Sequence, residues 1–270
     1  MLRRWRCPRS SNGPAGGQVA VDPKAYEVVR ELEESHWFFV ARRRILARLL
    51  DEVMTGSAHA KTLDVGCGTG ATMGFLERYG EVTGLDISPK AVEYCREQGR
   101  KRLCLASGES LPFVDDIFDL VTALDLLEHL EHEAAGLREM WRVLKSDGRL
   151  LLVVPAFMFL WSEFDRFSGH YRRYTRRELK RRVEEAGFEV DRLSYFNTLL
   201  FPVIWGVRTV KNLMGTPASA GADLDLPGRV LNGLLTWVFS LESGLIARGQ
   251  LPFGVSLLCL ARKGRRHRVS

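Results

Sequence analysis

Short apolar runs alternate with amphipathic stretches between about Lys61 and Pro155. This alternation is typical of βαβ units, in which buried parallel strands are joined by helices that cover the sheet. The apolar runs predict strands at 61–65, 82–86, 102–106, 119–124 and 149–154. The amphipathic stretches predict helices at 70–79, 89–97 and 133–144.

Capping residues mark the starts of two helices. Ser88-Pro89 places a serine at a helix cap and a proline at the first helical position, where the missing N–H costs nothing. Thr175 and Glu178 have the spacing of a capping box, and Gly187 is a stop signal. We therefore expect a helix at 175–186 and a strand at 188–194. Residues 255–260 (VSLLCL) predict a last buried strand.

Two additions surround this pattern. Residues 23–56 predict an N-terminal helical cover, and residues 197–254 predict an apolar helical insertion before the last strand at 255–262. Pro202 and Glu242 interrupt the apolar stretches of the insertion, so neither reaches the ~20 apolar residues of a membrane span. Helical spacing of its apolar residues indicates core packing, and the sharper hypothesis is a cover for a lipid-like acceptor or a membrane contact.

The formal charge of +6 is unevenly placed. Residues 1–21 hold four cations and 262–270 hold five, both without an acid, so removing these nine from 39 leaves 30 cations against 33 acids. The body is thus near −3, and no nucleic-acid partner is expected. We interpret 1–22 as a disordered basic tail and 263–270 as a second basic tail.

The cysteine pattern bears on the compartment. The five cysteines are an odd number, are scattered and include no CxxC pair. This argues against a disulfide framework and against a zinc cluster, and we expect no metal site. The first 20 residues contain no apolar core of a secretory signal. These features predict a cytoplasmic protein.

A glycine turn, LDVGCGTG at 63–70, follows the first predicted strand. The spacing also satisfies the dinucleotide fingerprint, whereas the absence of a following GK[ST] excludes a P-loop. Asp64, two residues before the first glycine, would repel a pyrophosphate and attract the ammonium of an amino-acid-bearing cofactor. Asp86 ends the second strand, where a carboxylate accepts the hydroxyls of a ribose in either cofactor class.

Two further segments complete the pattern, ASGESLPF at 106–113 and LDLLEHL at 124–130. With the glycine turn they resemble class I S-adenosylmethionine-dependent methyltransferases, closely over 61–155. The resemblance implies a Rossmann-like α/β fold, a doubly wound, mostly parallel seven-stranded sheet with a core at 57–196 and a substrate lid at 156–174. It implies cofactor contacts from Asp64, Gly66, Cys67, Gly68, Gly70, Asp86, Ile87, Ser107, Gly108 and Leu124. Ser107 departs from the family, which usually has an aspartate there.

Two clusters, in the cover and in the lid, stand where this fold places its acceptor. We take His36, His129 and His170 as candidates for a base or substrate contact, although isolated histidines are more often structural. Substrate contacts are expected from Tyr26, Trp37, Tyr171, Arg172 and Arg173. The basic run at 172–182 either receives an anionic group or is a solvated helix face.

The sequence therefore predicts transfer of a methyl group from S-adenosylmethionine to a small-molecule or lipid-linked acceptor by in-line displacement, with oxygen favoured over nitrogen or carbon. Two alternatives stay open. One is an NAD(P)-dependent oxidoreductase, which Asp64 disfavours, and the other is a non-catalytic S-adenosylmethionine-binding protein. Peripheral membrane contact through 197–248 and the basic tail is the expected partnership besides the acceptor.

Overall fold

The structure is a computed structural model that describes Cys7 and residues 23–55, 59–213 and 226–264. The predicted tail at 1–22 lies outside the described residues except for Cys7, and so does the predicted tail at 263–270 except for its first two residues. Residues 214–225, within the predicted insertion, also lie outside them.

The centre of the molecule is a seven-stranded sheet with the order β3-β2-β1-β4-β5-β7-β6. All neighbours pair in parallel except β7, which is antiparallel to both β5 and β6. This confirms the predicted doubly wound fold. The strands are β1 Ala60–Val65, β2 Gly80–Asp86, β3 Leu103–Leu105, β4 Phe118–Leu124, β5 Leu144–Pro155, β6 Phe188–Phe196 and β7 Ser256–Lys263.

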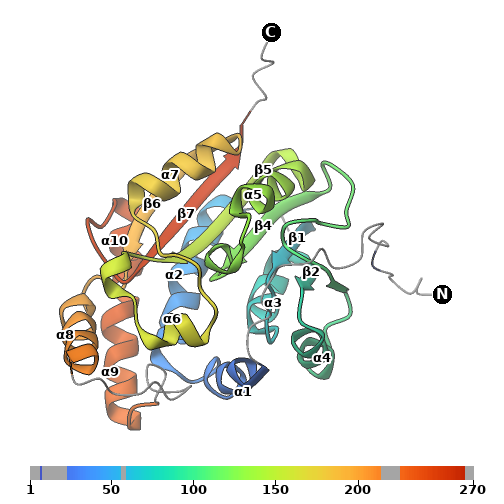
Figure 1. Cartoon of the computed structure of the whole chain (residues 1–270). Coiled ribbons are helices and arrows are strands. Elements are labelled where there is room, and N and C mark those ends of the chain that lie inside the picture. The colour runs from blue at the N-terminus through green and yellow to red at the C-terminus, as the bar shows by residue number, and fades with distance from the viewer. Residues whose placement is uncertain (1–6, 8–22, 56–58, 214–225, 265–270) are drawn as a thin grey trace.

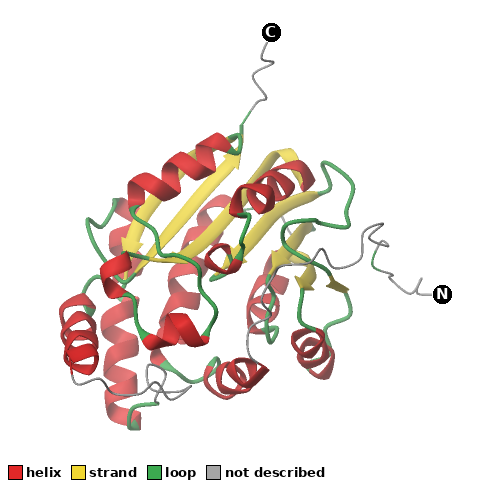
Figure 2. Cartoon of the chain, in the orientation of Figure 1, coloured by secondary structure: helices red, strands yellow, loops and turns green. Residues whose placement is uncertain are grey.

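Helices cover both faces of the sheet (Figure 2). Leu137 of α5 and Val183 of α7 belong to one buried cluster, and Ile45 of α2 and Met73 of α3 belong to the other. The helices are α3 Ala71–Leu76, α4 Pro89–Glu97, α5 Glu133–Val143 and α7 Arg176–Glu185, with α6 Glu163–Phe167 in the lid. Short 3-10 helices occupy Glu77–Tyr79, Leu127–His129 and Met158–Leu160.

The predicted caps are present. Ser88 is the N-cap of α4, and its side chain accepts a hydrogen bond from the backbone N–H of Ala91. Thr175 and Glu178 form the reciprocal capping box of α7. The strand that differs most from its predicted range is β5. The chain runs from α5 directly into β5, which pairs with β4 five residues earlier than predicted.

The cover and the insertion are joined although they lie at opposite ends of the sequence. The cover is α1 Pro23–Leu32 and α2 Trp37–Val53, and the insertion is α8 Phe201–Leu213, α9 Arg229–Ser240 and α10 Glu242–Arg248. Asn232 of α9 accepts a hydrogen bond from the Trp37 N–H at 2.9 Å and donates one to the Ser35 carbonyl at 2.8 Å. The α9 helix therefore packs on α2, at the edge of the molecule in Figure 1.

The expectation that no stretch of the insertion reaches the length of a membrane span is wrong. In the described part of the chain, Arg229–Arg248 is a 20-residue helix that is long and apolar enough to cross a membrane by length and composition alone, and 22% of its apolar 18-residue window is buried. Glu242, which was expected to interrupt the apolar stretch, does not lie on the surface. Glu242 is fully buried and accepts hydrogen bonds from the N–H groups of Thr198 and Leu199 at 2.7 and 2.8 Å.

The expectation against disulfides also needs correction. Cys7 and Cys104 of β3 form a disulfide, with Cα atoms 5.3 Å apart and a sequence separation of 97. Cys67, Cys95 and Cys259 are buried free thiols. An odd cysteine count excludes complete pairing but not a single bond between segments that the fold brings together.

Candidate functional site

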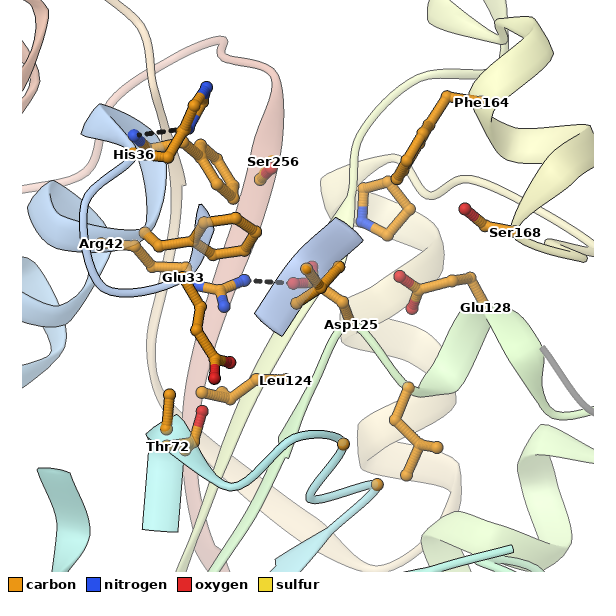
Figure 3. A pocket seen from close by; sticks show the side chains of 18 of the residues that line it. Glu33, His36, Arg42, Thr72, Leu124, Asp125, Glu128, Phe164, Ser168 and Ser256 are labelled. Carbon is orange, nitrogen blue, oxygen red and sulfur yellow. Dashed lines mark hydrogen bonds and ion pairs between the residues drawn. The ribbon is translucent and has the colours of Figure 1, made fainter. Parts of the chain in front are cut away.

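A cavity of about 530 Å³ lies at the carboxyl ends of the parallel strands. Ligands of open α/β sheets bind at this edge, where the loops leave the strands. The cover closes one side of the cavity, the lid another, and α8 supplies part of the wall. Figure 3 shows side chains from the cover and the lid facing one common space.

The glycine turn forms the floor of the cavity after β1. Gly66, Gly68 and Gly70 have φ angles of +73°, +53° and +98°, which residues with a Cβ adopt only with strain. A Cβ on Gly66 would lie 2.8 Å from Leu126, whereas a Cβ on Gly68 would meet nothing within 4 Å. The backbone at Gly68 thus leaves open space beside it.

Asp64 lies beneath this turn and does not line the cavity. It is 1% exposed, and its Oδ1 accepts a hydrogen bond from the Thr122 hydroxyl at 2.6 Å. Its buried Oδ2 has no hydrogen-bond partner among the described residues. Burial raises the pKa of the Asp64 carboxyl to about 7, helped by the nearby charge of Asp86 and opposed by the bond from Thr122.

Asp86 lines the cavity at the tip of β2. Its carboxylate accepts hydrogen bonds from the N–H groups of Gly68 at 3.0 Å and Ser88 at 2.9 Å. The Tyr26 hydroxyl of the cover donates a longer bond, at 3.4 Å, to Oδ1. Burial raises the pKa of Asp86, although these donors oppose the shift.

The cover adds charged groups to the same cavity. Glu33 is 5% exposed and accepts a hydrogen bond from the Thr69 hydroxyl of the glycine turn. Arg42 forms an ion pair with Asp125, which follows β4 (Figure 3). His36 is the N-cap of α2, because its ring Nδ1 accepts the Phe38 N–H at 3.3 Å.

A buried network in the lid holds His170. Asp165 is fully buried and contacts the His170 Nδ1 at 2.7 Å and two guanidinium nitrogens of Arg173 at 2.8 Å each. Burial alone would raise the pKa of Asp165, but the bond to His170 and the charge of Arg173 hold that pKa well below its usual range. Asp165 therefore fixes the orientation of the His170 ring through Nδ1, and the other ring nitrogen, Nε2, is not engaged by this bond.

Glu128 and His129, in the 3-10 helix after β4, line the cavity together with His170 of the lid. Glu128 is fully buried, and in the described part of the chain neither carboxylate oxygen has a hydrogen-bond partner. The His129 and His170 rings are perpendicular with centroids 4.6 Å apart. Burial, with the neighbouring His170, lowers the pKa of His129 to about 3, so this imidazole is neutral.

Three turns at the cavity edge carry strain. Asp125, Phe157 and Asn197 have φ angles of +52°, +56° and +58°, and they follow the ends of β4, β5 and β6. Non-glycine residues in this conformation cluster at binding sites, where the surrounding structure compensates for their cost. Asp125 and Asn197 also line the cavity.

The structure brings together most of the site residues predicted from the sequence. The cavity is lined by Tyr26, His36, Trp37, Gly66, Cys67, Gly68, Asp86, Ile87, Gly108, Leu124, His129, His170 and Arg173. Asp64, Gly70, Ser107, Tyr171 and Arg172 do not line it. In the basic run, Arg172 and Arg182 pair with Glu133 and Arg173 pairs with Asp165, so these charges are engaged within the protein.

Sequence reasoning missed Glu33, Arg42, Asp125 and Asp165 as individual site residues. Their partners come from elements far away in the sequence, so no local spacing reveals the pairs. One signal was available for Asp125. It is the first residue after a predicted strand, the position from which parallel sheets present site residues.

Comparison with known proteins identifies the family. Residues 63–152 match the model of a methyltransferase domain. The chain is 31% identical over 191 residues to the ubiquinone/menaquinone biosynthesis C-methyltransferase UbiE of Proteus mirabilis, covering 57% of this chain and 75% of that protein. It is 31% identical over 163 residues to the malonyl-[acyl-carrier protein] O-methyltransferase of Halorhodospira halophila, covering 55% of each.

The fold agrees with these matches. The crystal structure of YcgJ from Bacillus subtilis superposes with a TM-score of 0.53 at 23% identity, covering 81% of this chain and 97% of that one. The matches to the first curated relatives span 41% to 55% of their length, about half. Because the match to the Proteus mirabilis enzyme covers three quarters of that protein, this chain belongs to the S-adenosylmethionine-dependent methyltransferases.

Proposed function

We propose that this protein transfers the methyl group of S-adenosylmethionine to a small-molecule or lipid-linked acceptor, with an oxygen atom as the favoured nucleophile. The observation that supports the proposal most strongly is the continuity of the cavity. The same cavity is lined by Gly68 and Asp86, which are expected to contact the cofactor, and by His36 and His170, which are expected to contact the acceptor. A donor held by the first pair and an acceptor held by the second would meet in line, shielded from water.

The residues expected to contact the cofactor fit its chemistry. The open space at Gly68 admits a ligand against the backbone, and the unpartnered Oδ2 of Asp64 needs a donor that a cofactor ammonium would supply, directly or through one water. Asp86 would exchange its long bond from Tyr26 for ribose hydroxyls. The bound cofactor supplies an activated methyl on a sulfonium, so the chain has only to align the reactants and accept a proton where the nucleophile carries one.

The wall expected to contact the acceptor is apolar with a few polar groups. Val203, Ile204 and Val207 of α8 and Leu235 of α9 line the cavity, which suits an acceptor with an apolar body. Glu128, His129 and His170 lie in the same region and would contact its polar atom. One of the two named relatives is a C-methyltransferase and the other an O-methyltransferase. Oxygen is therefore favoured here because of the polar cluster, and not because of the similarity to these relatives.

We also propose that the protein is cytoplasmic and contacts a membrane surface through the insertion. Val230, Leu234 and Trp237 of α9 are 88%, 53% and 60% exposed. Arg229 and Arg248, at the two ends of this helical stretch, are exposed beside them. An exposed apolar helix face with flanking cations is typical of a segment that lies in the membrane interface.

Calorimetry and a transfer assay test the proposed reaction. We expect S-adenosylhomocysteine to bind to the purified chain, NAD not to bind, and Asp86→Ala to weaken the binding by about tenfold or more, because a charge-assisted pair of hydrogen bonds is lost. Radiolabelled S-adenosylmethionine with a lipid extract should then give a labelled product. NAD binding would favour the oxidoreductase alternative, and cofactor binding without any labelled product from lipid and water-soluble extracts would favour the non-catalytic one.

A further inference from the structure

The cluster of Glu128, His129 and His170 has potential ligand atoms that the rest of the protein does not use. One potential ligand atom from each residue lies within 4.8 Å of the others. Both Glu128 oxygens and the Nδ1 of His129 are buried and, over the described residues, lack a hydrogen-bond partner. Fully buried polar atoms are nearly always paired, so a group that supplies the missing interactions is expected at this position.

We propose that Glu128, His129 and His170 bind a divalent transition-metal ion in the cavity. Two imidazoles and one carboxylate are the donor set of many catalytic zinc sites, and they suit Zn²⁺, Co²⁺ or Mn²⁺ better than Ca²⁺ or Mg²⁺. We expected no metal site because the sequence has no CxxC pair. A donor set of two histidines and one glutamate, however, needs no cysteine.

The second hydrogen bond of each imidazole fits metal binding. A metal-ligating histidine usually gives its other ring nitrogen to a carboxylate or a backbone carbonyl, which fixes the ring. Asp165 takes the Nδ1 of His170 at 2.7 Å, and the backbone of Ser168 bonds to the His129 ring, whose Nδ1 stays unpaired within the described structure. In a tetrahedral site the donors would lie about 3.4 Å from one another, so the present separations of up to 4.8 Å would shorten by up to about 1.4 Å when the ion binds.

The surrounding charges leave room for a cation. Asp125 is paired with Arg42, and Asp165 is paired with Arg173. Glu128 is the carboxylate of this group without such a partner in the region that the structure describes. A bound dication would supply the positive partner that a buried, ionised carboxylate needs. Figure 3 shows Glu128 and Asp125 facing the same side of the cavity.

Three protein ligands leave a coordination position open, as in catalytic rather than structural metal sites. Because the three residues line the cavity, this position faces the space assigned to the acceptor. The inference that an acceptor hydroxyl or carboxylate oxygen occupies it rests on the proposed function. Metal binding itself does not, so the two are tested separately.

The test uses the full chain without an affinity tag, stripped with a chelator and titrated with Co²⁺. We expect uptake of about one ion per chain, with the visible absorption of low-symmetry Co²⁺, and displacement by Zn²⁺. Glu128→Gln and His170→Asn should each weaken Co²⁺ binding by about tenfold to a hundredfold or more, since even outer partners of metal ligands have effects of this size. His132→Gln, which changes an exposed histidine outside the cluster, should bind Co²⁺ as the unaltered chain does.

Binding of S-adenosylhomocysteine serves as the folding control for each variant. Retained cofactor binding with lost Co²⁺ binding supports the metal site. A stripped chain that shows no Co²⁺ spectrum, or one whose Co²⁺ binding is unchanged in both cluster variants, overturns it. Since neither readout uses methyl transfer, a failure of the metal site is distinct from a failure of the proposed activity.

Discussion

At Asp64, a buried carboxyl has one oxygen bonded to Thr122 and one without a partner in the described chain. Its pKa is raised to about 7 by burial. A raised carboxyl pKa means that the folded protein retains a proton that the unfolded chain loses near pH 4. In the cofactor-free protein, the stability that this proton provides is complete below pH 4 and is lost as the pH rises through 7.

We predict that cofactor affinity depends on pH through Asp64. A cofactor ammonium favours the ionised carboxylate, so the Kd for S-adenosylhomocysteine should increase by up to about tenfold per unit as the pH falls below 7. Isothermal titration between pH 5.5 and 8 measures this slope. Asp64→Asn should bind more weakly at pH 8 and show a flatter profile.

The same variant gives a check that needs no ligand. Cofactor-free Asp64→Asn should lose less stability than the unaltered chain between pH 5 and 8, measured by urea unfolding, because the amide has no charge to bury. An unchanged pH profile of cofactor binding in Asp64→Asn would show that another group controls it.

Residues of the glycine turn were predictable because their chemistry lies in a contiguous segment. The spacing of Gly66, Gly68 and Asp86 restricts the ligand class before any contact is known. Asp165 was not predictable in the same way. Its role depends on its ion pairs with Arg173 and His170, which form because the chain turns back after the short lid helix. A single aspartate in the sequence does not indicate that such pairs form.

At the scale of elements, α9 is the least typical helix of the molecule. Its Phe239 is fully buried against Phe196, whereas Val230, Leu234 and Trp237 point away from the core. A helix that is apolar on both its buried and its exposed face needs a second apolar environment.

We predict that the exposed face of α9 controls binding to vesicles. Replacing Val230, Leu234 and Trp237 by serine should reduce flotation with anionic phospholipid vesicles by about tenfold or more, since each substitution removes apolar area from the interface. A matched control is Val114→Ser, an apolar residue that is 70% exposed outside the insertion. Equal flotation of the triple variant and this control would contradict the proposed membrane contact.

Element boundaries followed from the sequence wherever a cap was local, as at Ser88 and Thr175. They failed where tertiary contacts decide. The early start of β5 depends on pairing with β4, and the continuity of α9 into α10 depends on the burial of Glu242 under distant N–H groups. The disulfide of Cys7 likewise depends on where the chain end lies relative to β3.

At the scale of the whole molecule, Asn232 is a side chain that joins the cover to the insertion. Asn232 bonds to the backbone of Ser35 and Trp37, at the junction between α1 and α2. The walls of the cavity therefore come from segments almost 200 residues apart. The contacts between them include the two Asn232 bonds, a longer bond from Arg44 to the Ser240 hydroxyl, and aromatic contacts with Phe239.

We predict that Asn232→Ala destabilises the protein by about 1–3 kcal/mol, because it leaves backbone groups unpaired. Dissociation of S-adenosylhomocysteine should become faster, since the cover is held less firmly. Urea unfolding and stopped-flow fluorescence measure the two effects. Thr209→Ala, which removes a side-chain bond within α8 alone, is the control and should change neither by a comparable amount. Stability and dissociation like those of the control would refute a coupling role for Asn232.

The hydroxyl of Tyr26 rests on an oxygen of Asp86 that a ribose would also require. The Tyr26 hydroxyl and a bound ribose would thus compete for the same oxygen of Asp86, which Tyr26 occupies in the cofactor-free protein. We predict that α1 has to move away from Asp86 before the nucleoside binds. The observed association rate should therefore level off at high ligand concentration, with the opening frequency of α1, not diffusional encounter, as its ceiling.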